Sequence, residues 1–153
     1  MDLKQIYLLD TNIVSELAKP SPDEKLLINL DAQSCFSVIS STVWYEILKG
    51  IAILPEGSTK SKLDKYATEY VQAVFPILPY DEHCASLQAN IDSKMKEKGT
   101  PLSYKDAQIA ATALANNLIL VTRNTKDFEA ICREFPLHVE NWFEYVESRH
   151  ANA

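Results

Sequence analysis

The chain has 153 residues, of which 46% are hydrophobic and 24% charged, and its formal net charge at pH 7 is −6. This composition is typical of a folded globular domain and excludes an intrinsically disordered chain. Only three glycines occur, Gly50, Gly57 and Gly99, and their spacing matches neither of the glycine-rich loops that bind dinucleotides and nucleotide phosphates, so both are excluded as well. The three cysteines lack a C-x-x-C spacing and the three histidines lack ligand spacing, which argues against a zinc site and a disulfide framework.

Targeting and membrane segments are not apparent. No apolar stretch has the length of a signal-peptide core or a transmembrane helix, so we expect a cytoplasmic protein with reduced cysteines and no membrane partner. The acidic balance argues against non-specific sliding along nucleic acid, which depends on lysine and arginine. It is compatible with an acidic site that contacts phosphates through metal ions.

Alternating apolar patterns predict strands and helices. Residues 6–9 and 118–121 are continuously apolar, as expected for strands that a parallel sheet buries on both faces. Ser21 is the expected N-cap of the first long helix, because a proline and then an acid follow it. In chain order we expect a strand at 6–9, a helix at 22–30, a weaker strand at 36–39, helices at 41–54 and 60–74, an edge strand at 75–78, a helix at 82–98, a helix from Tyr104 and a strand at 118–121.

This order predicts an α/β sandwich with a mainly parallel sheet. We expect one domain over residues 1–148, followed by a disordered tail over residues 149–153. Ligands in such sheets bind at the carboxyl ends of the strands, near the point where the strand order reverses. Polar residues at those strand ends are therefore candidates for a functional site.

Asp10 is the first candidate. It follows the strand at 6–9 directly, and Thr11 and Asn12 add two more oxygen-bearing side chains at the same turn. All three residue types also serve as helix N-caps, so capping of the next helix is an equal alternative.

Asp106 is a stronger candidate. On a helix that begins at Tyr104, it shares a stripe with Ile109 and Ala110, which places its carboxylate on an apolar face. A carboxylate there costs several kcal/mol or takes up a proton unless a cation or strong donors compensate. The alternative is a capping box between Ser103 and Asp106.

Glu46 and Asp127 are weaker candidates when each is taken alone. Glu46 flanks the apolar stripe of its helix, and the mid-helix Gly50 suggests either close backbone packing or room for a ligand. A surface glutamate is the alternative. Asn124 and Asp127 are spaced as a helix N-cap and a first-turn acid, so capping is the simpler explanation of both.

Convergence favours a shared site over separate caps. Two strand ends and two helices each offer a carboxylate, and the α/β architecture brings them to one edge of the sheet. Several carboxylates in one place need positive charge, and oxygen ligands without Cys or His select Mg²⁺ or Mn²⁺ over zinc. A metal-dependent phosphodiesterase follows as a hypothesis, with one or two ions.

The same residues carry a resemblance to PIN-domain ribonucleases, in matching order and spacing. The similar segments are residues 8–17, 46–50, 106–114 and 120–128. Residues 19–23, residues 77–81 and the pair Asn141-Trp142 are also similar to the VapC and FitB branch of that family.

The resemblance implies a three-layer α/β/α sandwich with four to five mainly parallel strands. It implies a Mg²⁺- or Mn²⁺-dependent endoribonuclease that cleaves RNA with metal-activated water and is the toxin of a type II toxin–antitoxin pair. It further implies a homodimer whose cognate antitoxin masks the site, forms a hetero-oligomer with the toxin and binds operator DNA.

Site residues are implied position by position. Asp10, Glu46 and Asp106 match the acidic triad of the family, and Asp127 matches its usual fourth acid, so these four are the expected metal ligands and catalytic residues. The expected supporting or substrate-binding polar residues are Thr11, Asn12, Asn124 and Arg123. Asn116-Asn117 replaces a turn that often has glycine, which asparagine tolerates.

Candidates for contacts with RNA phosphates are Arg123 and the four lysines around Gly99, namely Lys94, Lys96, Lys98 and Lys105. A solvated helix face is the alternative for the lysines. Trp44 is expected in the core, whereas Trp142 is left open between packing and base stacking.

Two other functions are alternatives for this sequence. A phosphorylation receiver also has an acidic pocket at strand ends, but it needs an adjacent acid pair after the first strand, and Asp10 stands instead beside Thr11 and Asn12. A non-catalytic PIN-like binding protein is the other alternative. The four acids argue against it, because a degenerate site has no reason to keep mutually repelling charges.

Overall fold

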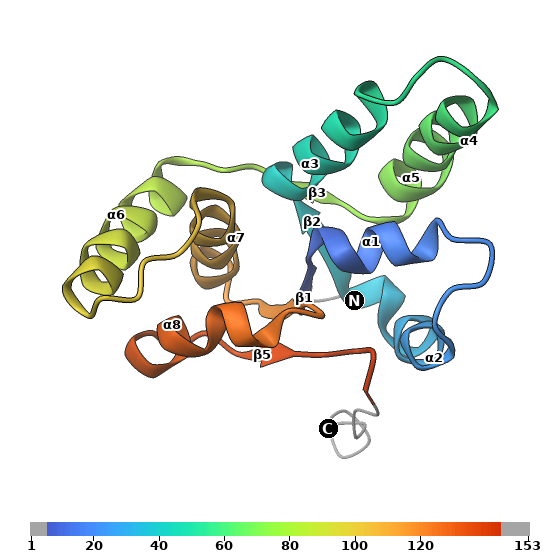
Figure 1. The fold of residues 1–153 in the computed structure, drawn as a ribbon. Coiled ribbons are helices and arrows are strands. Elements are labelled where there is room, and N and C mark those ends of the chain that lie inside the picture. The colour runs from blue at the N-terminus through green and yellow to red at the C-terminus, as the bar shows by residue number, and fades with distance from the viewer. Residues whose placement is uncertain (1–5, 145–153) are drawn as a thin grey trace.

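The structure, a computed structural model, describes residues 6–144 (Figure 1). The tail expected at 149–153 and the ends of the domain expected over 1–148 lie outside the described residues. Five strands form one sheet: β1 Tyr7–Leu9, β2 Ser37–Ser40, β3 Ile77–Leu78, β4 Ile119–Val121 and β5 Val139–Glu140.

Helices connect these strands. The α-helices are α1 Thr11–Leu17, α2 Glu24–Gln33, α3 Ser41–Ala52, α4 Ser58–Tyr66, α5 Gln72–Val74, α6 Glu82–Glu97, α7 Tyr104–Ala115 and α8 Glu129–Glu134. Two short 3₁₀ segments, η1 Ser34–Phe36 and η3 Thr125–Phe128, and one π-helical segment, η2 Ala67–Val71, complete the set. Within residues 6–144 no helix combines the length and apolar character needed to cross a bilayer.

The sheet has the order β3-β2-β1-β4-β5, and all neighbouring strands are parallel. The chain adds β2 and β3 on one side of β1 and then returns to add β4 and β5 on the other. The reversal of strand order therefore lies between β1 and β4, which is where ligands bind in such sheets. Tyr7 pairs with Ile119 and Leu9 with Val121, so these two strands end at the same level.

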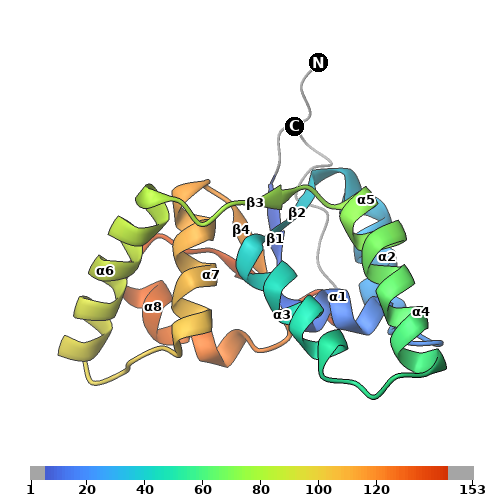
Figure 2. The same ribbon diagram turned by 90° about the horizontal axis from the view of Figure 1, so that it is seen from above.

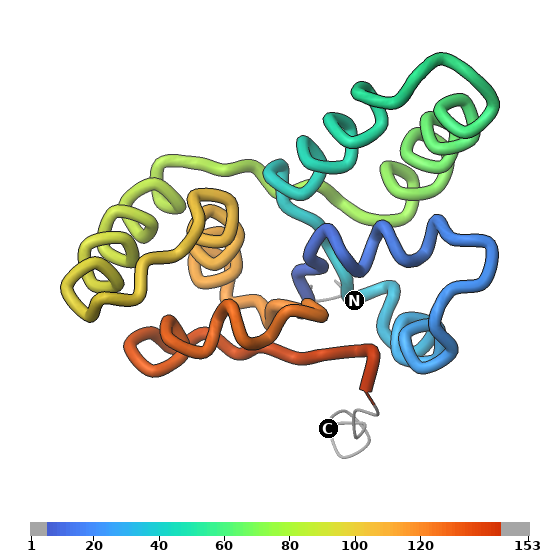
Figure 3. The backbone as a smooth tube through the Cα atoms, in the orientation of Figure 1, coloured from blue at the N-terminus to red at the C-terminus, as the bar shows by residue number. Residues whose placement is uncertain are grey.

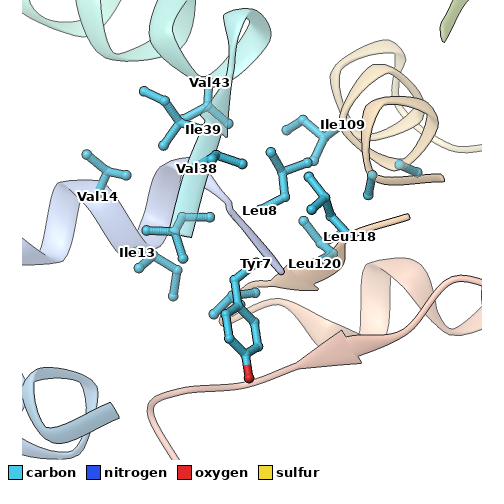
Figure 4. Packing of buried hydrophobic residues seen from close by; sticks show 14 of the residues in the cluster. Tyr7, Leu8, Ile13, Val14, Val38, Ile39, Val43, Ile109, Leu118 and Leu120 are labelled. Atoms are coloured by element: carbon cyan, nitrogen blue, oxygen red, sulfur yellow. The ribbon is translucent and has the colours of Figure 1, made fainter. Parts of the chain in front are cut away.

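The expected three-layer α/β/α sandwich is confirmed. Figures 1 and 2 show α6, α7 and α8 together on one side of the sheet and the helices from α1 to α5 on the other. Buried side chains from β1, β2, β4 and α7 fill the centre, among them Leu8, Ile39, Leu120 and Ile109, none of which is exposed (Figure 4). Because both faces are covered, the central strands β1 and β4 are continuously apolar rather than alternating.

Several element boundaries differ from the sequence expectation. The first long helix begins at Glu24, because Asp23 and not Ser21 is its N-cap: the Asp23 Oδ1 atom accepts from the amides of Lys25 and Leu26. The helix expected at 60–74 is interrupted by the π segment η2. The strand expected at 75–78 is limited to Ile77–Leu78, and the two-residue strand β5 was not predicted at all.

Both tryptophans have defined environments. Trp142 is 1% exposed, packs edge-on against Tyr7 at 4.9 Å between ring centroids, and donates from Nε1 to Glu140 Oε2 at 2.9 Å. The open question about Trp142 is thereby answered in favour of packing. Trp44 is partly buried against the core, as expected.

Asn117 is the non-glycine residue with a positive φ, 54°, among the described residues. We expect Asn117→Ala to lower the free energy of unfolding by about 1 kcal/mol, because the left-handed conformation costs most L-residues roughly 1–2 kcal/mol. Asn117→Gly should match or exceed the wild type, since glycine adopts this conformation freely. Urea denaturation of the two variants measures the difference, and equal stabilities would contradict the expectation.

Candidate active site

Asp10 lies at the carboxyl end of β1, only 3% exposed. Its Oδ1 atom accepts from the Thr11 amide at 2.7 Å and so caps α1, while Oδ2 accepts from the Thr122 hydroxyl at 2.8 Å. The two interpretations of Asp10 from the sequence, as a helix N-cap and as a functional-site residue, are thus compatible. One oxygen serves the helix, and the other faces the next strand end.

A small polar network ties the ends of β1 and β4 together. The Asn12 side-chain amide donates to Thr122 Oγ1 at 3.1 Å and approaches Asp10 Oδ2 at 3.5 Å. The Asn12 Oδ1 atom accepts from the backbone amide of Arg123 at 3.0 Å, and Thr122 Oγ1 also accepts from the backbone amide of Asn124 at 3.1 Å. The network fixes the orientation of the Asp10 carboxylate.

Thr122 was not predicted as a site residue, yet it is completely buried and contacts Asp10 directly. Its position in the sequence could have indicated this role. Thr122 follows the apolar run 118–121 just as Asp10 follows 6–9, and paired parallel strands bring the residues after them together.

Asp106 lies in the first turn of α7, half-buried, with its amide bound to the Ser103 hydroxyl at 3.1 Å. Burial raises the pKa of its carboxyl, and the charges of Asp10 and Asp127 raise that pKa further, while the Ser103 hydroxyl and Lys105 act in the opposite direction. The serine cap expected at Ser103 is therefore present, and the charges of two other carboxylates nevertheless act on Asp106 at this edge of the sheet.

Asp127 lies on the short segment η3 and is exposed. Together with Asp106 it lines a groove of about 410 Å³, whose other walls are Thr100, Pro101, Leu102, Ser103 and Ala130. Asn124 occupies the N-cap position of η3, as the capping explanation expects, but its side chain makes no capping hydrogen bond to that segment.

Glu46 is half-buried on α3, and it is not among the groups that most strongly shift the pKa of Asp106. Its position is set indirectly. Thr42, one turn earlier on α3, donates to Gln108 Oε1 of α7 at 3.1 Å, and residues four apart share a helix face. The face of α3 that carries Glu46 is therefore held beside α7, the helix of Asp106.

The mid-helix Gly50 is not explained by close packing, since a Cβ atom placed there would meet nothing within 4 Å. It lines a mainly apolar cavity of about 210 Å³ between α1, α3 and α4. That cavity is lined by Val14, Ser15, Ala18, Ile47, Ile51, Leu63 and Tyr66 as well, and does not include Glu46.

The basic candidates divide into two groups. Lys94 and Lys98 lie 3.9 and 3.7 Å from the carboxylates of Glu97 and Glu134, as expected for a solvated helix surface. Lys105 differs, because its charge acts directly on Asp106. Arg123 follows Thr122 at the end of β4 and is exposed.

The residues fit a hydrated divalent cation better than an ion enclosed by protein. Across the part of the chain that the structure describes, no three His, Cys, Asp or Glu side chains are close enough to enclose a metal. Mg²⁺ commonly takes one or two carboxylates and completes its shell with water and substrate phosphate. Asp10 and Asp106 offer such oxygens, and the buried hydroxyl of Thr11, the residue after Asp10, has no hydrogen-bond partner among the described residues.

Comparisons with known proteins show the family of this chain. A model of the PIN domain family matches residues 7–134. Toxin FitB from Neisseria gonorrhoeae is 36% identical over 128 residues, which cover 82% of this chain and 92% of that protein. VapC ribonuclease Y4jK from Sinorhizobium fredii is 32% identical over 128 residues, which cover 82% of this chain and 91% of that protein.

A solved structure of FitAB bound to an IR36 DNA fragment contains a chain with a TM-score of 0.81 and 31% sequence identity, covering 95% of this chain and all of that one. Both the sequence and the fold thus match over nearly the full length, and nothing in these matches supports a phosphorylation receiver. The chain belongs to the PIN domain family, in the branch that contains the FitB toxin and the VapC ribonucleases.

Proposed function

We propose that this protein is a divalent-metal-dependent endoribonuclease that hydrolyses RNA phosphodiester bonds and acts as the toxin of a toxin–antitoxin pair. The observation that carries the proposal is that Asp10 lies at the end of β1, where the strand order of the sheet reverses, and that its charge and that of Asp127 both raise the pKa of Asp106. The names of relatives at 32–36% identity, a ribonuclease and a toxin, support the same activity and role.

Mg²⁺ or Mn²⁺ is the proposed cofactor, held by Asp10 and Asp106 with Glu46 and Asp127 as further ligands. When bound, such an ion activates a water molecule and neutralises charge on the leaving oxygen of the phosphodiester. The protein itself supplies orientation. Thr122 and the Thr11 amide fix the Asp10 carboxylate, and this preorganised geometry is what allows a charged site to act without rearrangement.

The remaining polar residues have supporting roles in the proposal. Asn12 and Thr11 hold the turn after β1, and the backbone amide of Asn124 donates to the Thr122 hydroxyl. Arg123 and Lys105 are the proposed contacts to RNA phosphates, Lys105 being the lysine whose charge acts on Asp106. Positive charge beside an acidic centre lets an acidic protein bind RNA locally.

We also propose the assembly implied by the family. The toxin is a homodimer that binds a cognate antitoxin in a hetero-oligomer, and operator DNA is contacted only through the antitoxin. FitAB, in which a similar chain is part of a DNA-bound complex, supports this arrangement. A cytoplasmic location is proposed as well, supported by Cys35, Cys84 and Cys132 all being unpaired.

RNA cleavage by the purified chain, freed of any partner, tests the proposed activity. Structured RNAs should be cut with Mg²⁺ or Mn²⁺ present and left intact in EDTA. The chain with Asp10→Asn, prepared in parallel, detects contaminating nucleases. Cleavage that persists in EDTA, or that is equal in the variant, would refute the metal-dependent mechanism.

Expression in the native host tests the proposed toxin role. Expression of this chain alone is expected to arrest growth, because uncontrolled RNA cleavage stops translation, and co-expression of the adjacent small DNA-binding protein should restore growth. The Asp106→Asn chain is the matched control and should be harmless. If active wild-type protein does not slow growth, the toxin role is wrong even where the nuclease activity holds.

A further inference from the structure

Arg123 is an exposed arginine that the fold holds in one place. Its guanidinium lies over the ring of Phe143, 4.5 Å from the centroid, and forms no hydrogen bond or ion pair with any residue in the range 6–144. A guanidinium that lies over an aromatic ring keeps N–H donors available for other partners. Those donors match the geometry of a phosphate.

Phe143 comes from the far end of the described chain and is itself fixed. Its amide donates to Asn141 Oδ1 at 2.9 Å, and the preceding Trp142 is buried in the core. Asn29 of α2 donates to the carbonyl oxygens of Trp142 at 3.0 Å and of Glu144 at 3.1 Å. Figure 3 shows this last described segment leaving β5 and turning on the side of the molecule where α2 lies. Hydrogen bonds therefore hold the backbone that carries the Phe143 ring, and this ring is the platform under Arg123.

A short chain of hydrogen bonds connects Arg123 to the acidic site. The Arg123 amide binds Asn12, and Asn12 in turn contacts Thr122 and Asp10. The charge of Arg123 contributes to lowering the pKa of Glu16, but the main cause is the hydrogen bond and ion pair of Glu16 with Lys19 at 2.6 Å. Because Glu16 is paired with Lys19, the guanidinium of Arg123 is available to an external anion.

We propose that Phe143 is a positioning residue: it holds the Arg123 guanidinium as a preformed anchor for an RNA phosphate adjacent to the one that is cleaved. This inference rests on the proposed ribonuclease function and assigns a task to the segment 141–144. Arg123 and Lys105 then bind the strand on opposite flanks of the acidic centre, Arg123 beside α1 and Lys105 on α7.

Steady-state kinetics on a short single-stranded RNA substrate, with Mg²⁺, tests the assignment. Arg123→Ala should raise KM by about tenfold or more, the usual effect of losing a charge-assisted hydrogen bond, while kcat changes little. It should also reduce the salt dependence of RNA binding by about 0.7 in log–log slope, which corresponds to one phosphate contact on a single strand. Lys62→Ala, which removes an exposed charge from α4, should change neither quantity.

The Phe143 variants separate positioning from stability. Phe143→Leu should raise KM severalfold, whereas Phe143→Tyr should keep the wild-type KM. In the Arg123→Ala background, Phe143→Leu should raise KM no further, because the effects of coupled residues are not additive. Phe135→Leu is the control for a merely structural effect, because Phe135 is also partly buried against the core. This variant should lower the melting temperature without raising KM.

Three results would overturn the proposal. The first is an unchanged KM in Phe143→Leu, and the second is effects of the two substitutions that simply add. The third is a set of variants that weaken antitoxin binding but leave the KM for RNA unchanged, since the anchor would then serve a protein. A wild-type protein that cleaves no RNA under any metal condition defeats the proposed function instead. In that case RNA binding by the intact protein, measured by fluorescence anisotropy, still tests the Arg123 and Phe143 pair.

Discussion

Asp10→Asn is expected to reduce RNA cleavage by roughly 10²–10³-fold or more, the range found when one preorganised electrostatic group is removed from an active site. Asparagine keeps the size of the side chain and can still accept from the Thr11 amide, so α1 remains capped. What it loses is the negative charge that would hold the cation. Single-turnover cleavage of a defined RNA by wild type and variant, with excess Mg²⁺, measures the effect.

A graded series makes this prediction sharper. Thr122→Val deletes the hydroxyl that donates to Asp10 Oδ2 and should cost about 10–100-fold, as is usual for groups that orient a metal ligand. Thr122→Ser should retain most of the activity, because it retains the donor.

Asp23→Asn is the matched control for capping. Asp23 caps α2 through two backbone amides, as Asp10 caps α1, but it ends no strand. Its substitution should leave cleavage unchanged, with little loss of stability because asparagine is also a good N-cap. Near-wild-type activity of Asp10→Asn, or a loss of activity in Asp23→Asn equal to that in Asp10→Asn, would contradict the assignment of the site.

The sequence predicted the centre of the fold well, because burial on both faces of a parallel sheet leaves a direct mark on residue type. The runs at 6–9 and 118–121 became β1 and β4, and the residues after them meet as expected. Periodicity likewise predicted that Asp106 lies on the inner side of its helix, and the raised pKa of its carboxyl agrees with that position.

What the sequence did not show depends on tertiary contacts. Ser21 and Asp23 are both acceptable N-caps, and only the path of the chain selects Asp23. The strand Val139–Glu140 is too short to have a pattern of its own and exists because β4 offers it a free edge. Phe143 has no local motif, since its role comes from stacking on a residue 20 positions earlier in the chain.

Asp106→Asn is expected to make the metal-free protein more stable while abolishing its activity. The pKa of Asp106 is raised in the folded state, first by burial and then by Asp10 and Asp127. A carboxyl with a raised folded pKa favours the fold only at acid pH, where it is protonated, and this contribution is lost as the pH rises through the folded pKa. At pH 7 the charged group is therefore unfavourable, and a neutral amide removes the cost. Melting temperatures in EDTA at pH 7 measure it, and the advantage of the variant should shrink as the pH is lowered.

Added metal should reverse this order. A ligand that binds only the folded state stabilises it by RT ln(1 + [L]/Kd), about 2.7 kcal/mol at one hundred times Kd, which is a rise of roughly 5–10 °C for a chain of this size. Wild-type protein should show this rise with Mg²⁺ or Mn²⁺, and Asp106→Asn should show much less of it. If Asp106 served only the N-terminus of α7, neutralising it would instead remove roughly 0.3–1 kcal/mol of favourable interaction with the helix dipole and leave the metal response unchanged. A variant that is less stable than the wild type in EDTA and equally stabilised by metal would therefore show that the carboxylates are separate caps, and the proposed nuclease site would have to be abandoned.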